Sequence, residues 1–99
     1  MKTSLDKILI GTMSGTSHDG IDVCALRINK KRFELLKFTS YKYPQRLRKD
    51  ISDVIQNQTL SLNEYFEIDK KIGFAFGESI NKFIVKNHIK KNEIIAIGL

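Results

Sequence analysis

The fold is decided by residues 7–28, KILIGTMSGTSHDGIDVCALRI, which place a polar loop between two apolar runs. Residues 7–13 and 21–28 carry apolar side chains on both alternations, a pattern typical of central strands covered on two faces. The loop between them, residues 14–20, holds three hydroxyls, two glycines and an acid. A plain hairpin needs far fewer functional groups, so this loop is the first candidate for a site.

A third strand and a first helix are predicted after a turn at residues 29–31. Residues 32–43 mix Phe and Leu with Glu, Lys and Ser on both alternations, as expected for an edge strand whose lysines discourage stray pairing. Pro44 ends this strand and can open a helix, since a first-turn residue needs no free N–H. We expect the helix to end around Asn57. Its apolar stripe comprises Leu47, Ile51, Val54 and Ile55.

A longer helix is predicted to begin at Ser61-Leu62-Asn63-Glu64. At this spacing the serine hydroxyl and the glutamate carboxylate form a capping box that satisfies backbone N–H groups of the first turn. The apolar stripe of the helix begins at Leu62 and Phe66 and extends to about His88. A histidine there would suit the negative end of the helix dipole.

The last apolar run, residues 94–99 (IIAIGL), follows a helix and is predicted to be a strand parallel to its neighbour. Within the preceding helix, Gly73 and Gly77 lie one turn apart. We expect them to allow close approach to the sheet, and glycines tolerated without a role are the alternative. The chain is therefore α/β: a three-stranded antiparallel meander, two helices and a parallel strand, forming one partial domain over residues 1–99.

The loop has the composition of a phosphate cradle. Glycines let backbone N–H groups turn toward one point, and the hydroxyls of Ser14, Thr16 and Ser17 can donate to phosphate oxygens. The P-loop pattern GxxxxGK[ST] and the dinucleotide fingerprint GxGxxG are both absent from the sequence. Spacing alone leaves two alternatives, a phosphate site and an ordinary polar hairpin.

The longer string favours the phosphate site. Residues 10–22, IGTMSGTSHDGID, resemble the N-terminal signature of the anhydro-N-acetylmuramic acid kinases, in which a strand is followed by Met-Ser-Gly-Thr-Ser-x-Asp-Gly-x-Asp. The match is in unbroken register and comprises Met13, Ser14, Gly15, Thr16, Ser17, Asp19, Gly20 and Asp22. Residues 72–76 and 94–99 resemble the long helix and the following strand of this family. The resemblance covers the whole chain but only about the first quarter of a family member.

The resemblance implies the opening half of a ribonuclease-H-like lobe of the actin and hexokinase type. It also implies ATP-dependent phosphorylation of 1,6-anhydro-N-acetylmuramic acid at the 6 position, with opening of the anhydro ring, in peptidoglycan recycling. The family's catalytic aspartate lies well past Leu99. The resemblance therefore assigns no catalytic residue to this chain, and we expect the isolated 99 residues to be inactive as a kinase.

The ATP-binding loop of the family corresponds to Gly15, Thr16, Ser17, His18, Asp19, Gly20, Ile21 and Asp22. The two glycines would shape the turn, and the two hydroxyls would donate to phosphate. Asp19 or Asp22 would orient a Mg²⁺-bound water, although Asp22 could equally bond its own loop backbone. His18 fills the variable position of the signature, and we expect it to face solvent or pack on the loop. No direct metal ligand is predicted.

Composition sets the remaining bounds. Seventeen Lys and Arg against 11 Asp and Glu give a net charge of +6, which favours anionic partners. The basic clusters at 27–32 and 46–49 are expected to be solvated faces rather than a nucleic-acid surface, because no RNA-binding signature or helix-turn-helix accompanies them. One cysteine, no signal peptide and no membrane-length apolar run favour a cytoplasmic protein. The alternative function is a non-catalytic phosphate-binding or interaction domain of the same fold, and the sequence leaves a homo-oligomer open.

Overall fold

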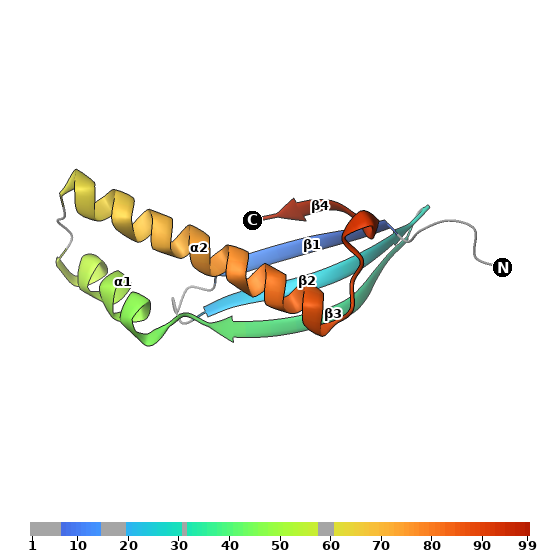
Figure 1. The fold of residues 1–99 in the computed structure, drawn as a ribbon, viewed down its shortest axis with the longest axis horizontal. Coiled ribbons are helices and arrows are strands. Elements are labelled where there is room, and N and C mark those ends of the chain that lie inside the picture. The colour runs from blue at the N-terminus through green and yellow to red at the C-terminus, as the bar shows by residue number, and fades with distance from the viewer. Residues whose placement is uncertain (1–6, 15–19, 31, 58–60) are drawn as a thin grey trace.

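The computed structural model describes residues 7–14, 20–30, 32–57 and 61–99. The elements follow one another in the predicted order (Figure 1). They are β1 (Lys7–Ser14), β2 (Gly20–Asn29), β3 (Arg32–Lys42), α1 (Gln45–Asn57), α2 (Leu62–Lys86), the 3₁₀ turn η1 (Lys91–Glu93) and β4 (Ile94–Gly98). This order confirms the α/β class.

The four strands form one mixed sheet in the order β3-β2-β1-β4. The β1–β2 and β2–β3 pairs are antiparallel, and β4 is parallel to β1, with Ile10 opposite Ile97. The sequence analysis correctly placed β1 and β2 in the centre and β3 at an edge. Because α1 and α2 carry the chain from the β3 edge to the far side of β1, β4 joins the sheet through a crossover, as a parallel strand must.

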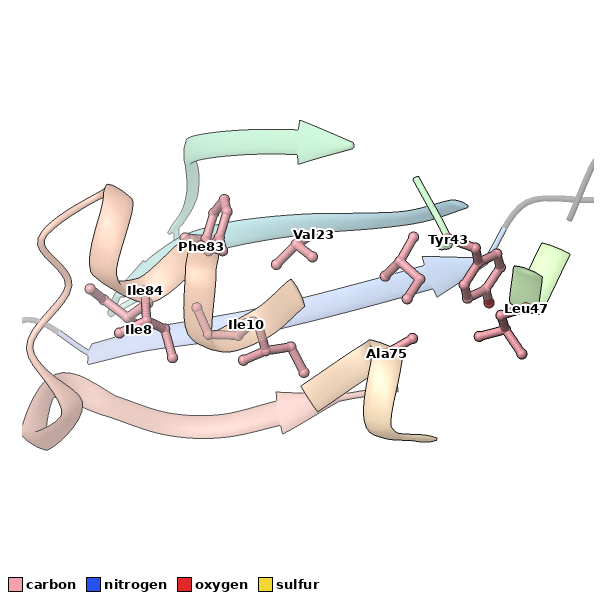
Figure 2. Packing of buried hydrophobic residues seen from close by; sticks show 11 residues of the cluster. Ile8, Ile10, Val23, Tyr43, Leu47, Ala75, Phe83 and Ile84 are labelled. Carbon is pink, nitrogen blue, oxygen red and sulfur yellow. The ribbon is translucent and has the colours of Figure 1, made fainter. Parts of the chain in front are cut away.

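The core lies between the sheet and α2, which crosses one face of it (Figures 1 and 2). Strand alternation directs Ile21, Val23 and Ala25 of β2 toward this helix. Phe83 of α2 is completely buried against them. The full cluster comprises Ile8, Ile10, Ile21, Val23, Ala25, Tyr43, Leu47, Ala75, Ile80, Phe83 and Ile84.

The other face of the sheet differs from the prediction. We expected the central strands β1 and β2 to be covered on both faces, yet on this face Met13 of β1 is exposed and Leu26 and Ile28 of β2 are only half-buried. The neighbouring edge strand β3 exposes Phe33, Leu35 and Phe38 on the same face. Within the described ranges, the long helix covers a single face (Figure 1). Apolar residues on both alternations show that both faces of a strand are suited to burial. The element that covers each face comes from another part of a chain, so the sequence of the strand cannot predict it.

The first half of α2 extends past the end of the sheet and lies beside α1 (Figure 1). Lys71 of α2 forms an ion pair with Asp50 of α1 at 3.6 Å, and the molecule measures 58 × 22 × 21 Å. Leu62 and Phe66, which the predicted stripe included, are consequently 67% and 56% exposed. The extended shape follows from a helix longer than the sheet it covers.

The two glycines of α2 do not serve the close approach that we expected. A Cβ built on Gly73 or Gly77 meets nothing within 4 Å, and both residues are exposed. The prediction was wrong because the two glycines line an open cavity, with Ile97 of β4 on its far side, and no close contact forms there. On this part of α2 an alanine would find open space.

Both ends of α2 are capped by local hydrogen bonds. The predicted capping box is confirmed: the Glu64 N–H donates to Ser61 Oγ at 3.1 Å, and the Ser61 N–H donates to Glu64 Oε1 at 3.0 Å. The hydrogen bond from the Ser61 backbone N–H, and after it a hydrogen bond from the Ser61 side chain, lower the pKa of the Glu64 carboxyl. The helix ends two residues before the predicted limit, and His88 follows its C-cap with a left-handed φ of 55°. Neither described helix has the length and apolarity needed to span a membrane.

Candidate functional site

The candidate site lies where three strands end together. β3 and β1 run in the same direction because both are antiparallel to β2, and β4 is parallel to β1. The carboxyl ends of these three strands and the start of β2 therefore lie together at one end of the sheet, its carboxyl edge. Ligands of open α/β sheets bind outside the carboxyl ends of the strands. Of the predicted ATP-loop residues, Gly15, Thr16, Ser17, His18 and Asp19 lie outside the described residues, and Gly20, Ile21 and Asp22 lie within them.

Gly20 is a position where only glycine fits. A Cβ built there would collide with the Tyr41 carbonyl oxygen, and it would lie 3.1 Å from the Tyr41 carbonyl carbon and 3.2 Å from the Lys42 Cα. These are backbone atoms of β3, paired with β2 at this point. We expected this glycine to shape the turn. In the structure it begins β2 and lets that strand lie close against β3.

Ile21 and Asp22 point to opposite faces of the sheet, as neighbours in a strand must. Ile21 is 1% exposed and belongs to the core, so its side chain is unavailable to a ligand. The Asp22 carboxylate accepts a hydrogen bond from the Ser40 hydroxyl of β3, at 2.6 Å between the two oxygens. This cross-strand bond fixes the orientation of Asp22 and leaves its second carboxylate oxygen without a described partner.

A second pair of polar groups lies on the other face of the same edge. The Tyr43 hydroxyl donates to Ser14 Oγ at 3.0 Å, and the Tyr43 ring packs beside Leu47 at the end of β1 (Figure 2). The sequence analysis named Ser14 as a donor but missed Tyr43. The available signal was a tyrosine at the end of a strand, directly before the helix-opening Pro44.

A third hydroxyl ties the end of β4 to this edge. Thr12 Oγ1 of β1 donates to the Gly98 carbonyl oxygen at 3.0 Å. β1 and β4 are thereby held together next to the start of β2. No group of three or more His, Cys, Asp or Glu side chains suited to a metal ion occurs in the described part of the chain.

The fold and the position of this edge define a class of protein. A three-stranded meander, a helical crossover and a parallel strand on the far side of β1 form the opening half of a ribonuclease-H-like lobe, as in actin and the sugar kinases.

Comparison with known proteins identifies the family. The model of the anhydro-N-acetylmuramic acid kinase family matches residues 7–99. Relatives with that name include a protein of Gamma-proteobacterium EBAC31A08, 43% identical over 93 residues and 94% of this chain, and one of Sulfurimonas denitrificans, 41% identical over 95 residues and 96% of this chain. A relative from Actinobacillus pleuropneumoniae is 35% identical over 91 residues, or 92% of this chain. The chain belongs to the anhydro-N-acetylmuramic acid kinase family.

The match is restricted to one part of each relative. The chain covers 25%, 26% and 25% of the lengths of these three proteins. It thus spans about a quarter of the curated relatives that it matches, and this quarter contains the edge described above.

Proposed function

We propose that this chain supplies the ATP-phosphate site of an anhydro-N-acetylmuramic acid kinase. The complete enzyme would transfer the γ-phosphoryl group of ATP to the 6 position of 1,6-anhydro-N-acetylmuramic acid while water opens the anhydro ring, as part of peptidoglycan recycling in the cytoplasm. The observation that carries the proposal is the family match over residues 7–99, which includes the signature of residues 13–22; of that signature, Ser14 ends β1 and Gly20 begins β2.

The described residues at this edge suit a triphosphate. Ser14, the last residue of β1, is exposed and carries a hydroxyl that can donate to a phosphate oxygen. Among the described residues at this edge, Asp22 is acidic, and its carboxylate already accepts a hydrogen bond from the Ser40 hydroxyl. ATP would supply the phosphoryl group, and Mg²⁺ would neutralise charge on its phosphates. Asp19 or Asp22 would reach that ion through water, because a carboxylate facing the triphosphate directly would repel it.

Other segments of the enzyme would supply its remaining functions. The base that activates water, the groups that fix the sugar and the second lobe that closes over ATP belong, by the family's pattern, to segments after residue 99. Placement and electrostatics account for most of the catalysis of phosphoryl transfer. We therefore expect residues 1–99 alone to bind nucleotide weakly and to transfer no phosphate.

A chimera tests the proposal. Residues 7–99 would replace the matching quarter of the relative from Gamma-proteobacterium EBAC31A08, and transfer of labelled phosphate from ATP to the anhydro sugar would be measured. We expect transfer by the parent and the chimera and none by the isolated chain. Thr16→Ala in the chimera should raise the KM for ATP about 10-fold, the effect of one charge-assisted hydrogen bond, with little change in the KM for the sugar.

The other outcomes separate the alternatives. A folded chimera that binds ATP without transferring phosphate would favour the non-catalytic phosphate-binding domain. A folded chimera that neither binds nor transfers, beside an active parent, would remove the loop from the ATP site.

A further inference from the structure

Two hydroxyl side chains from distant parts of the sequence meet at the base of the phosphate loop. Ser14 is the last residue of β1 and is exposed, whereas Tyr43 follows β3 and is 5% exposed. Their oxygens lie 3.0 Å apart, although the residues are separated by 29 positions. The Tyr43 ring is held by the core beside Leu47 (Figure 2). A rigid buried group therefore fixes the orientation of an exposed and otherwise mobile one.

The direction of this hydrogen bond decides what Ser14 can offer a ligand. Either hydroxyl can donate across this distance, and a phenol is the more acidic of the two groups, so we assign the Tyr43 hydroxyl as the donor. Ser14 Oγ accepts this bond, so its own hydrogen remains available to an acceptor on the solvent side. A hydroxyl that accepts a hydrogen bond also becomes a better donor, because the two bonds polarise each other.

Ser14 lies at the base of the proposed phosphate loop, where its hydroxyl can donate to a ligand. Ser14 is paired with Ile21 in the β1–β2 register, so the two residues close the base of the loop that joins the strands. An oriented hydroxyl donor is suited to an anion, and ordering the donor in advance lowers the entropy cost of binding it.

We propose that Ser14 binds a phosphate oxygen of the nucleotide and that Tyr43 is the positioning residue that orients it. This inference rests on the proposed ATP site and deepens it, because it adds Tyr43, one residue after β3, as the group that orients the first hydroxyl of the loop. Tyr43 acts through Ser14 and does not touch the ligand.

Titration of the 99-residue chain with MgATP at millimolar concentrations, followed by NMR of backbone amides, tests the pair. Loss of one hydrogen bond should weaken binding about three- to ten-fold in Ser14→Ala and in Tyr43→Phe. The double variant should be no weaker than Ser14→Ala alone, because Tyr43 has no route to the ligand without Ser14. Ser14→Thr, which keeps the hydroxyl, should bind as the unmodified chain does.

Two further measurements separate positioning from a structural role. The variants should lose affinity for tripolyphosphate by the same factors as for ATP, because Ser14 would contact a phosphate and not the adenine base. The matched control is Tyr41→Phe on β3, whose buried hydroxyl has no partner in the described structure. Tyr41→Phe should leave the affinity unchanged, and the melting temperature of each variant would show whether its fold is intact.

The outcomes that overturn the inference differ from those that overturn the proposed function. If the unmodified chain binds ATP and Ser14→Ala and Tyr43→Phe bind equally well, the pair has no role in binding while the ATP site stands. If the double variant loses as much binding free energy as the two single variants together, Tyr43 does not act through Ser14, and the inference also fails. If the unmodified chain binds neither ATP nor tripolyphosphate, the ATP site and the pair are both wrong.

Discussion

Replacing Gly20 with alanine should destabilise the sheet at the edge that carries the site. The new Cβ would collide with the Tyr41 carbonyl oxygen and would lie 3.2 Å from the Lys42 Cα, whereas ordinary contacts begin at 3.4 Å. Both neighbours are backbone atoms of β3, so no side chain can rotate away. The first residues of β2 would have to separate from β3, losing ladder hydrogen bonds beside Ser40 and Asp22.

The loss of stability caused by Gly20→Ala can be estimated from the known range for overpacked sites. Inserting one methyl group into a packed site destabilises a protein by about 1–3 kcal/mol, and a clash with backbone belongs at the upper end. A domain of this size loses roughly 4–8 °C of melting temperature per kcal/mol. We therefore expect Gly20→Ala to lower the melting temperature by about 10–20 °C in a thermal melt followed by circular dichroism.

Gly77→Ala is the matched control, because it adds the same methyl group where nothing lies within 4 Å. Alanine is about 1 kcal/mol better than glycine inside a helix, so this variant should melt roughly 4–8 °C higher than the unmodified chain. A Gly20→Ala protein as stable as the unmodified chain would refute the close approach of β2 to β3. A destabilised Gly77→Ala protein would show that α2 is covered at that position.

Phe83→Ala should lower the free energy of unfolding by about 3–5 kcal/mol in urea titrations, because the ring is completely buried between α2 and the sheet; a loss below 1 kcal/mol would contradict that packing. Ser61→Ala should cost about 0.5–2 kcal/mol in the same assay, since it removes the helix cap. The bonds from Ser61 lower the pKa of Glu64, so their contribution is complete above the ordinary carboxyl pKa and is lost as the pH falls through the lowered value. Melts between pH 6 and pH 2 should therefore show a smaller acid-induced loss in Glu64→Gln, and an identical loss would exclude this linkage. Thr12→Val removes the donor to the Gly98 carbonyl, so amide exchange in β4 should accelerate about 2- to 10-fold, the effect of one exposed hydrogen bond, while exchange in β2 stays unchanged.

Features that depend on neighbouring residues could be predicted from the sequence. The capping box of α2 requires only Ser61 and Glu64 at their spacing, and its two hydrogen bonds are present. The edge position of β3 followed from polar residues on both of its alternations, and the parallel β4 followed from the helix before it. The family signature likewise occupies one continuous stretch, and the family match agrees with it.

The sequence alone determined the order of the elements, the caps and the loop that carries the signature, because each depends on interactions over a few residues. The tertiary structure decided that Tyr43 meets Ser14, that Ser40 holds Asp22, that Gly20 has no room for a side chain and that Gly77 has ample room. These facts depend on the register of three strands and on where a long helix leaves the sheet. Register and crossing are fixed by the sum of contacts across the whole fold, and neither is encoded in the spacing of any single segment.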